Sequence, residues 1–237
     1  MSYKPTTTDL QTLVQLSAAQ SPPIDPVQVA LVLFEESTFN PSVQNAGGAP
    51  NYGLNQMSAT NIAGLGLTVS EWTSMTAAEQ LPYVFKWWAK QAAYANNGQF
   101  FSDAGQLLAL NLGQVAYKNV NAGSNPNAVL AGKSGPYANS YAGNPQLGNG
   151  AIITVNTCRA YLAKIAGGSS FGVLARQIEQ VEGVPSVSPQ STPSNPVQSF
   201  VTSLLGGLLL GGTAFIVTQE IERYRRPASR RKRRRAA

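Results

Sequence analysis

Two adjacent carboxylic acids, Glu35 and Glu36, follow an apolar run that starts at Val29. A carboxyl group at the end of a buried helix loses hydration, and this loss favours its protonated form. Protonated carboxyl groups with raised pKa values serve as general acids in enzymes. Both acids are equally close to the apolar run, so spacing alone does not choose between them. The alternative is that both cap the helix end and face water.

The composition limits the remaining catalytic chemistry to carboxylates, hydroxyls and lysines. The 237 residues include no histidine, which excludes histidine-based metal sites and both Ser-His-Asp and Cys-His catalysis. The one cysteine, Cys158, cannot form an intrachain disulfide. It lies in an apolar stretch, and we interpret it as a buried structural thiol. We expect neither a metal nor a cofactor.

Helical patterns dominate residues 1–182. Asp25 and Pro26 form a strong helix start, since Asp25 can cap the helix and Pro26 suits its first position, with Gln28 completing a capping box. This helix runs to about Ser37 and is apolar nearly all round, so we expect it at the centre of the core. No stretch shows sustained period-2 alternation, which favours a mainly α domain. Further helices are predicted over 9–19, 58–64, 81–94 and 103–112, with a helix or a strand followed by a helix over 151–166.

Two features of the helix predicted over 81–94 stay open. Pro82 either interrupts this helix or marks its true start. Its aromatic cluster, which includes Trp87 and Trp88, is interpreted as core packing in preference to a platform for sugars.

The end of the sequence differs sharply in composition from the rest. Residues 183–199 hold four prolines and five serines, which predicts a flexible linker. Residues 200–218 follow, and their first 18 carry no charge, so a helix there spans about 27 Å, close to the hydrocarbon core of a bilayer. We predict one transmembrane helix, with a buried soluble helix as the alternative.

The formal charge of +6 resides in the tail, residues 219–237. This tail has nine Lys or Arg against two Glu, a net of +7, and the preceding 218 residues have eight basic against nine acidic, a net of −1. The basic residues, 223–235, place the tail on the inner side of the membrane. They also suit anionic lipid or nucleic acid as partners. The N-terminus lacks the pattern of a signal peptide, and we expect none.

Residues 36–41 (ESTFNP), a Gly-rich loop and residues 53–57 (GLNQM) resemble the motifs of soluble lytic transglycosylases, enzymes of lysozyme-like fold. In that family the Glu before the Ser is the catalytic acid and base, so the resemblance selects Glu36. It implies that Ser37 forms hydrogen bonds near Glu36. It also implies that Gln56 and Met57 line the sugar subsite.

A third family motif, Ala-Tyr-Asn-x-Gly, is similar to residues 109–113 (ALNLG), and adds Asn111 to the substrate site. Leu110 stands where the family has Tyr, and Asn55 stands where it usually has Met. A later family Tyr is matched by Tyr137 or Tyr141, of which we prefer Tyr137. The resemblance covers roughly residues 27–141.

Few other carboxylates are free to assist, although glycosidases normally use a pair. By resemblance, transglycosylases use one Glu as acid and then base, aided by the substrate's N-acetyl group, and release a 1,6-anhydro product without water. We therefore expect a lysozyme-like lytic transglycosylase that cleaves the MurNAc–GlcNAc β-1,4 bond of peptidoglycan glycan strands. A muramidase and a non-catalytic virion structural or membrane protein are the alternatives.

The predicted topology also indicates a location. A single-pass membrane protein that opens the cell wall locally suits phage genome delivery, so we expect it in a virion membrane or the host envelope.

Overall fold

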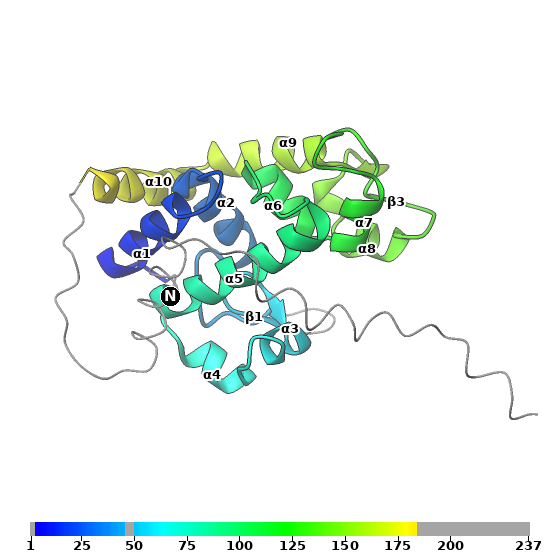
Figure 1. Cartoon of the computed structure of the whole chain (residues 1–237). Helices are drawn as coiled ribbons and strands as arrows, with labels where there is room; N and C mark the ends of the chain where they lie inside the picture. Colours follow the sequence, from blue (N-terminus) through cyan, green and yellow to red (C-terminus); the bar gives the residue numbers. More distant parts are fainter. Residues whose placement is uncertain (1–2, 46–49, 184–237) are drawn as a thin grey trace, which may run out of the picture. The chain divides into compact units, whose positions relative to one another are not determined.

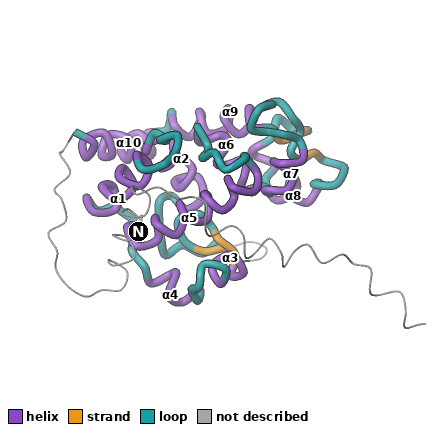
Figure 2. The backbone as a smooth tube through the Cα atoms, in the orientation of Figure 1, coloured by secondary structure: helices purple, strands orange, loops and turns teal. Residues whose placement is uncertain are grey.

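The computed structural model describes residues 3–45 and 50–183. Helices account for 58% of these residues, and each strand is only two residues long. Figure 2 shows that helices and loops make up most of the backbone and that strands are short. The prediction of a mainly α domain is confirmed. The predicted linker beyond Gly183, the predicted transmembrane segment 200–218 and the basic tail 219–237 lie outside the described residues. In the part of the chain that is described, no helix combines the length and the hydropathy needed to cross a membrane.

The elements follow one another along the chain in Figure 1. Two antiparallel strand pairs, β1–β2 and β3–β4, interrupt the helices, with Asn51 opposite Ser58 and Ala131 opposite Ile153. The helices are α1 (Thr7–Ala18), α2 (Pro26–Ser37), α3 (Ala59–Ala63), α4 (Val69–Ser74), α5 (Ala77–Ala95), α6 (Ala104–Asn111), α7 (Gln114–Asn119), α8 (Ala138–Gly143), the 3-10 turn η1 (Pro145–Leu147), α9 (Val155–Ala166) and α10 (Ser169–Glu182); the strands are β1 (Asn51–Tyr52), β2 (Met57–Ser58), β3 (Ala131–Gly132) and β4 (Ile152–Ile153).

Helix α2 is the centre of the core, as its apolar sequence predicts. It packs against α1, α6, α9 and α10, and Val29, Val32 and Leu33 are completely buried. Asp25 caps its start by accepting a hydrogen bond from the amide of Val27 at 2.8 Å. Burial on several sides explains why no face of this helix is polar until its last turn, where Glu35 and Glu36 stand.

Helices α2 and α6 lie in contact and run in the same direction. Near their starts, Gln28 Oε1 accepts a hydrogen bond from the amide of Ala104 at 3.2 Å. Near their ends, Asn111 Nδ2 donates to Glu36 Oε1 at 2.7 Å. The capping box predicted at Gln28 is therefore wrong, because this side chain satisfies a free amide of α6 in place of its own helix. The α2–α6 pair therefore brings Glu36 and Asn111, which are 75 residues apart in the sequence, into contact.

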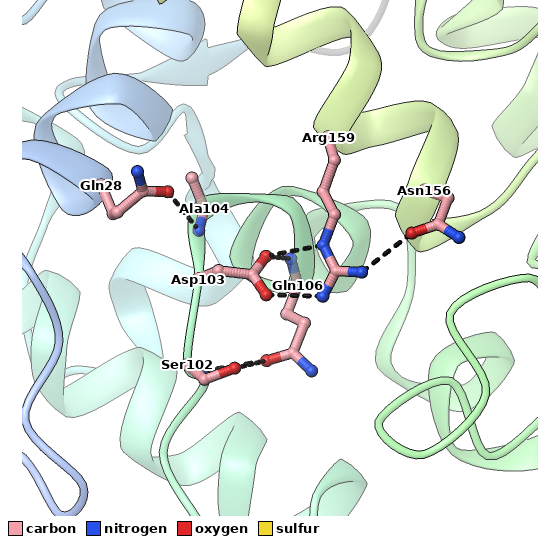
Figure 3. A network of polar contacts seen from close by, with 7 residues as sticks. All are labelled: Gln28, Ser102, Asp103, Ala104, Gln106, Asn156 and Arg159. Carbon is pink, nitrogen blue, oxygen red and sulfur yellow. Dashed lines mark hydrogen bonds and ion pairs between the residues drawn. The ribbon is translucent and has the colours of Figure 1, made fainter.

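The start of α6 is held by a polar network, shown in Figure 3. Asp103 caps the helix, its Oδ1 accepting from the amide of Gln106 at 3.0 Å. From α9, Arg159 donates to both carboxylate oxygens, with Nη2 2.6 Å from Oδ2 and Nε 3.3 Å from Oδ1. Its Nη1 donates to Asn156 at 2.8 Å. Together with the bond between Gln28 and Ala104, these contacts join α2, α6 and α9, and so they fix where α6 begins.

The turn between β1 and β2 is held from α5 by the fully buried Gln80. Its Oε1 accepts from the amide of Leu54 at 2.9 Å, and its Nε2 donates to the carbonyl of Pro41 at 2.7 Å. Gly53 has φ +74°, and a Cβ on it would overlap the Trp72 indole and the Gln80 amide, so glycine is required there. The Gln80 side chain thereby joins the motif of residues 36–41 to that of residues 53–57.

Two predictions about helices are settled by the structure, and one helix was missed. Pro82 neither interrupts α5 nor marks its start, so both alternatives are wrong: the helix starts at Ala77, behind a capping box of Thr76 and Glu79, and continues through Pro82 to Ala95. Residues 151–166 form a short strand followed by a helix, one of the two alternatives. Helix α10 was not predicted, although Phe171, Leu174 and Ile178 are buried at helical spacing. Cys158 is fully buried, as expected.

Candidate active site

A polar pocket of about 180 Å³ opens at the C-terminal ends of α2 and α6. The β1–β2 turn, α5 and the segment from Asn144 to Leu147 complete its wall. Carboxamides dominate the lining, together with one indole and a few apolar side chains. The lining residues are Glu36, Asn51, Asn55, Gln56, Met57, Asn61, Trp87, Leu108, Asn111, Leu112, Asn144 and Leu147.

Glu36 is the one ionisable side chain among the described residues that line this pocket. It keeps some accessible surface, but protein surrounds its carboxyl group, and this burial raises its pKa from 4.5 to about 7. The hydrogen bond from Asn111 lowers the pKa, and the charge of Glu35 raises it. The negative end of the α2 dipole also disfavours an anion there. The group can therefore hold or release a proton near neutral pH.

Glu35 has different surroundings from Glu36. It does not line the pocket, and the hydroxyl of Tyr161 in α9 lies 3.1 Å from each of its carboxylate oxygens. Burial raises the pKa of Glu35, and the hydrogen bond from Tyr161 lowers it. The structure thus resolves what spacing left open: Glu36 faces the pocket, and Glu35 points to α9. Neither acid is a capping group exposed to water.

Asn111 connects Glu36 to the β1–β2 turn. Its Nδ2 donates to Glu36 Oε1 at 2.7 Å and to Asn55 Oδ1 at 3.2 Å. Its Oδ1 is buried and has no hydrogen-bond partner. The sequence placed Asn111 in the site, and the structure shows it next to the carboxyl group itself.

The other predicted site residues divide into two groups. Gln56 and Met57 line the pocket, as the resemblance implies. Ser37 does not line it, because its Oγ donates to the carbonyl of Leu33 at 2.8 Å and closes the end of α2. Tyr137 is also outside the lining, and its hydroxyl accepts from Asn119 at 3.1 Å. The alternative Tyr141 is buried, only 7% exposed, and does not line the pocket either.

Sequence reasoning missed several pocket residues. Trp87 lines the pocket, while its neighbour Trp88 is fully buried in the core. Successive residues of a helix point about 100° apart, so the aromatic cluster interpreted as core places one indole in the core and one in the pocket wall. No local signal marks Tyr161, which lies 126 residues after Glu35. The other missed residues are three asparagines, Asn51, Asn61 and Asn144, and three leucines, Leu108, Leu112 and Leu147, which no sequence pattern distinguishes from other residues of their type.

Metal binding has no support within residues 3–45 and 50–183, where no group of three or more His, Cys, Asp or Glu side chains gathers. A second cavity of about 400 Å³ lies beside Asp103 and Arg159, lined mainly by apolar residues of α2, α6 and α9. Its charged groups are already paired with each other. No family model, curated protein or solved structure matches this chain. The interpretation of the site therefore depends on its own geometry.

Proposed function

We propose that the protein is a lytic transglycosylase that cleaves the MurNAc–GlcNAc β-1,4 bond of peptidoglycan with Glu36 as its acid and base. The observation that carries this proposal is a lone carboxyl group with a pKa of about 7 in a pocket lined by carboxamides. A general acid works best when its pKa lies near the working pH. The resemblance of residues 36–41, 53–57 and 109–113 to the family motifs agrees with this geometry.

The proposed reaction needs one carboxyl group in two protonation states. Protonated Glu36 gives its proton to the glycosidic oxygen, and the bond from that oxygen to C1 of MurNAc breaks as the N-acetyl carbonyl oxygen bonds to C1. The Glu36 carboxylate then takes the proton of the C6 hydroxyl. The C6 oxygen bonds to C1, displaces the N-acetyl oxygen, and forms the 1,6-anhydro ring. No water is consumed, and Glu36 ends protonated.

The pocket lining suits an uncharged part of a glycan. Carboxamides both donate and accept hydrogen bonds, as acetamido groups and sugar hydroxyls require. The Trp87 indole presents an apolar surface with a polar edge, the type of side chain that packs against sugar rings. We assign Trp87 to substrate binding together with Gln56 and Met57.

The location proposed for the enzyme is a membrane, through the apolar segment 200–218. The arginine-rich residues after it would lie inside, next to anionic lipid or nucleic acid, and the catalytic domain would lie on the other side. This topology suits local opening of the cell wall during phage genome delivery. Detection of the protein in purified virions, and its release by detergent, would support this location.

The function is tested by a zymogram with peptidoglycan in the gel. The wild type should clear the gel, and Glu36→Gln should lose about 10²- to 10⁴-fold in lytic rate, the usual contribution of general acid–base catalysis. Glu35→Gln is the matched control, since it makes the same change one residue away and outside the pocket; it should keep activity within about tenfold. Clearing by Glu36→Gln at the wild-type rate would exclude Glu36 as the catalytic group.

The products separate the lyase from a hydrolase. Mass spectrometry of the released muropeptides should show 1,6-anhydro ends, which weigh one water less than reducing ends. Reducing ends would make the protein a muramidase acting through the same carboxyl group. A wild type that binds peptidoglycan and releases nothing would favour the non-catalytic virion protein.

A further inference from the structure

Asn55 is a buried polar residue at the tip of the β1–β2 turn, only 5% exposed. Apolar residues usually occupy such positions, and a buried amide is retained at a cost unless its hydrogen bonds are satisfied. Its Oδ1 accepts from Asn111 Nδ2 at 3.2 Å, across 56 residues of sequence. The same nitrogen donates to Glu36 Oε1. Asn55 is therefore two hydrogen bonds away from the carboxyl group that the proposed function uses.

The conformation of the turn does not depend on the Asn55 side chain. Gly53 donates its amide to the carbonyl of Val43 at 2.8 Å, and Leu54 donates to the Gln80 amide at 2.9 Å. Gln56 closes the turn with Nε2 on the carbonyl of Gly53 at 2.9 Å. These contacts position the backbone at residue 55 from both sides. Because the turn is held by these other contacts, the Asn55 side chain is available to hold Asn111.

The orientation of Asn111 depends on few contacts. Its Oδ1 is buried without a partner, so the two bonds donated by Nδ2, to Glu36 and to Asn55, set the rotation of the carboxamide. If the acceptor at residue 55 is removed, the amide is held by Glu36 alone. It can then rotate and leave the carboxylate oxygen without a donor, since no other described side chain donates a hydrogen bond to Glu36.

We propose that Asn55 is a positioning residue, which holds the Asn111 carboxamide so that its N–H meets Glu36 Oε1. This inference rests on the proposed function for its catalytic consequence, but the contact itself does not. In physical terms, Asn55 helps to orient the carboxyl group and to stabilise its ionised form. Both are needed in the second half of the reaction, when Glu36 must act as a base.

The test measures the ionisation of Glu36 in the full-length chain. Labelling the side-chain carboxyl carbons of Glu with ¹³C and titrating by NMR gives each pKa, and the Glu36 signal is the one missing in Glu36→Gln. Asn55→Leu keeps the branching and the number of side-chain heavy atoms and removes the acceptor. The pKa of Glu36 should rise by about 0.5 to 1, as expected for weakening one hydrogen bond to the charged form.

A double-mutant cycle separates positioning from simple loss of polarity. Asn111→Leu should raise the pKa of Glu36 at least as much, and Asn55→Leu should add nothing in that background. A shift that persists without Asn111 would show that Asn55 acts directly, by changing the polarity of the site, and would overturn the proposal. Asn61→Leu is the matched control, since it removes another pocket carboxamide, and it should leave the pKa of Glu36 unchanged.

The wild type provides a test that does not depend on any variant folding. Exchange of the Asn111 side-chain amide protons with water should be slowed, because both are held by acceptors. Exchange as fast as for an exposed carboxamide would overturn the proposal.

Activity then distinguishes this inference from the proposed function. In an active enzyme, Asn55→Leu should lower kcat about tenfold while KM changes less than threefold. If the wild type is inactive but the pKa of Glu36 still responds to Asn55, the positioning role stands and the proposed function fails. If the wild type is active and Asn55→Leu changes neither the pKa nor kcat, only the positioning role fails.

Discussion

The two ends of the α2–α6 pair each hold a carboxyl group, and they treat it in opposite ways. At the N-terminal end, Asp103 accepts from a backbone amide at the start of α6 and from the guanidinium of Arg159 (Figure 3). At the C-terminal end, Glu36 accepts a hydrogen bond from one neutral carboxamide, that of Asn111, and a second carboxyl group, Glu35, precedes it in α2. The two sites are seven to eight residues apart along the same two helices.

The difference teaches how position alone assigns a role to a carboxyl group. A helix start carries partial positive charge, and with a cation beside it an anion is stabilised there. A helix end carries partial negative charge, and burial without a cation favours the neutral acid. Asp103 is therefore suited to structure and Glu36 to proton transfer. The hydrogen bond with Asp103 is also the main cause of the raised pKa of Arg159, as expected when each partner stabilises the charge of the other.

The largest energetic effect should come from Glu36→Gln, as a gain in stability at high pH. The pKa of Glu36 is about 7 in the folded state and 4.5 without its surroundings, so the folded state binds more protons between these values and loses stability as pH rises. Two and a half pKa units at 1.36 kcal/mol each set the upper bound at about 3 kcal/mol. Glu36→Gln removes the ionisable group, so the variant does not lose stability in this way as pH rises.

Denaturant unfolding of both proteins at pH 4 and pH 8 measures this effect. The difference in unfolding free energy, variant minus wild type, should increase between the two pH values. A difference that stays constant would show that burial at this end of the pair does not oppose the charge of Glu36.

Asp103→Ala should have the opposite sign and a smaller size. It removes the cap of α6 and leaves Arg159 without its carboxylate; the pair is partly exposed, so the cap accounts for most of the expected loss of about 1 to 2 kcal/mol. Thermal and denaturant unfolding at pH 7 measure it. Asp25→Ala, which removes the cap of α2 without an ion pair, is the comparison. A larger loss at Asp103 would measure what Arg159 adds.

Glu35→Gln should sharpen the comparison by removing one negative charge from the C-terminal end. The charge of Glu35 is the smallest of the three effects on the pKa of Glu36, so its removal should lower that pKa by only a few tenths. The alkaline limb of the profile of kcat/KM against pH should move to lower pH by the same amount. An alkaline shift would mean that Glu35 acts on Glu36 through structure and not through charge.

Tyr161→Phe should have the smallest effect. The hydrogen bond from Tyr161 lowers the pKa of Glu35. Its loss in the variant therefore raises that pKa, so Glu35 becomes a weaker acid and repels Glu36 less. The pKa of Glu36 should fall by less than in Glu35→Gln, and the Tyr161→Phe change should have no effect once Glu35 is Gln. The same ¹³C titration reports both carboxyl groups in one experiment.

The catalytic candidate and its helix were predictable because their signals are local. The cap at Asp25, the apolar run and the paired acids lie within one stretch, and residues 53–57 and 109–113 follow motifs that can be recognised one at a time. Burial around Glu36 then agrees with the prediction. The choice of Glu36 over Glu35 came from resemblance, and the structure gives it a physical basis in the direction each side chain takes.

The rest depended on contacts between distant residues. The partnership of Asn55 with Asn111 and that of Glu35 with Tyr161 cross 56 and 126 residues, and no spacing rule predicts them. The capping box predicted at Gln28 failed because another helix supplied a better donor. Helix α10 is a different case, since the spacing of Phe171, Leu174 and Ile178 was visible in the sequence, but its N-cap is Gly168, so no capping side chain marks where the helix begins.

The packing of helix α10 determines how far the domain can be truncated and how it responds to a pulling force. Phe171 packs edge-on against Phe34, with ring centroids 5.5 Å apart, and Phe34 immediately precedes Glu35. A fragment that stops at Gly168 would uncover this ring and the apolar side of α2, so the smallest stable fragment has to extend through Glu182. A force applied to the chain after Glu182 would likewise pull first on the helix that packs against α2.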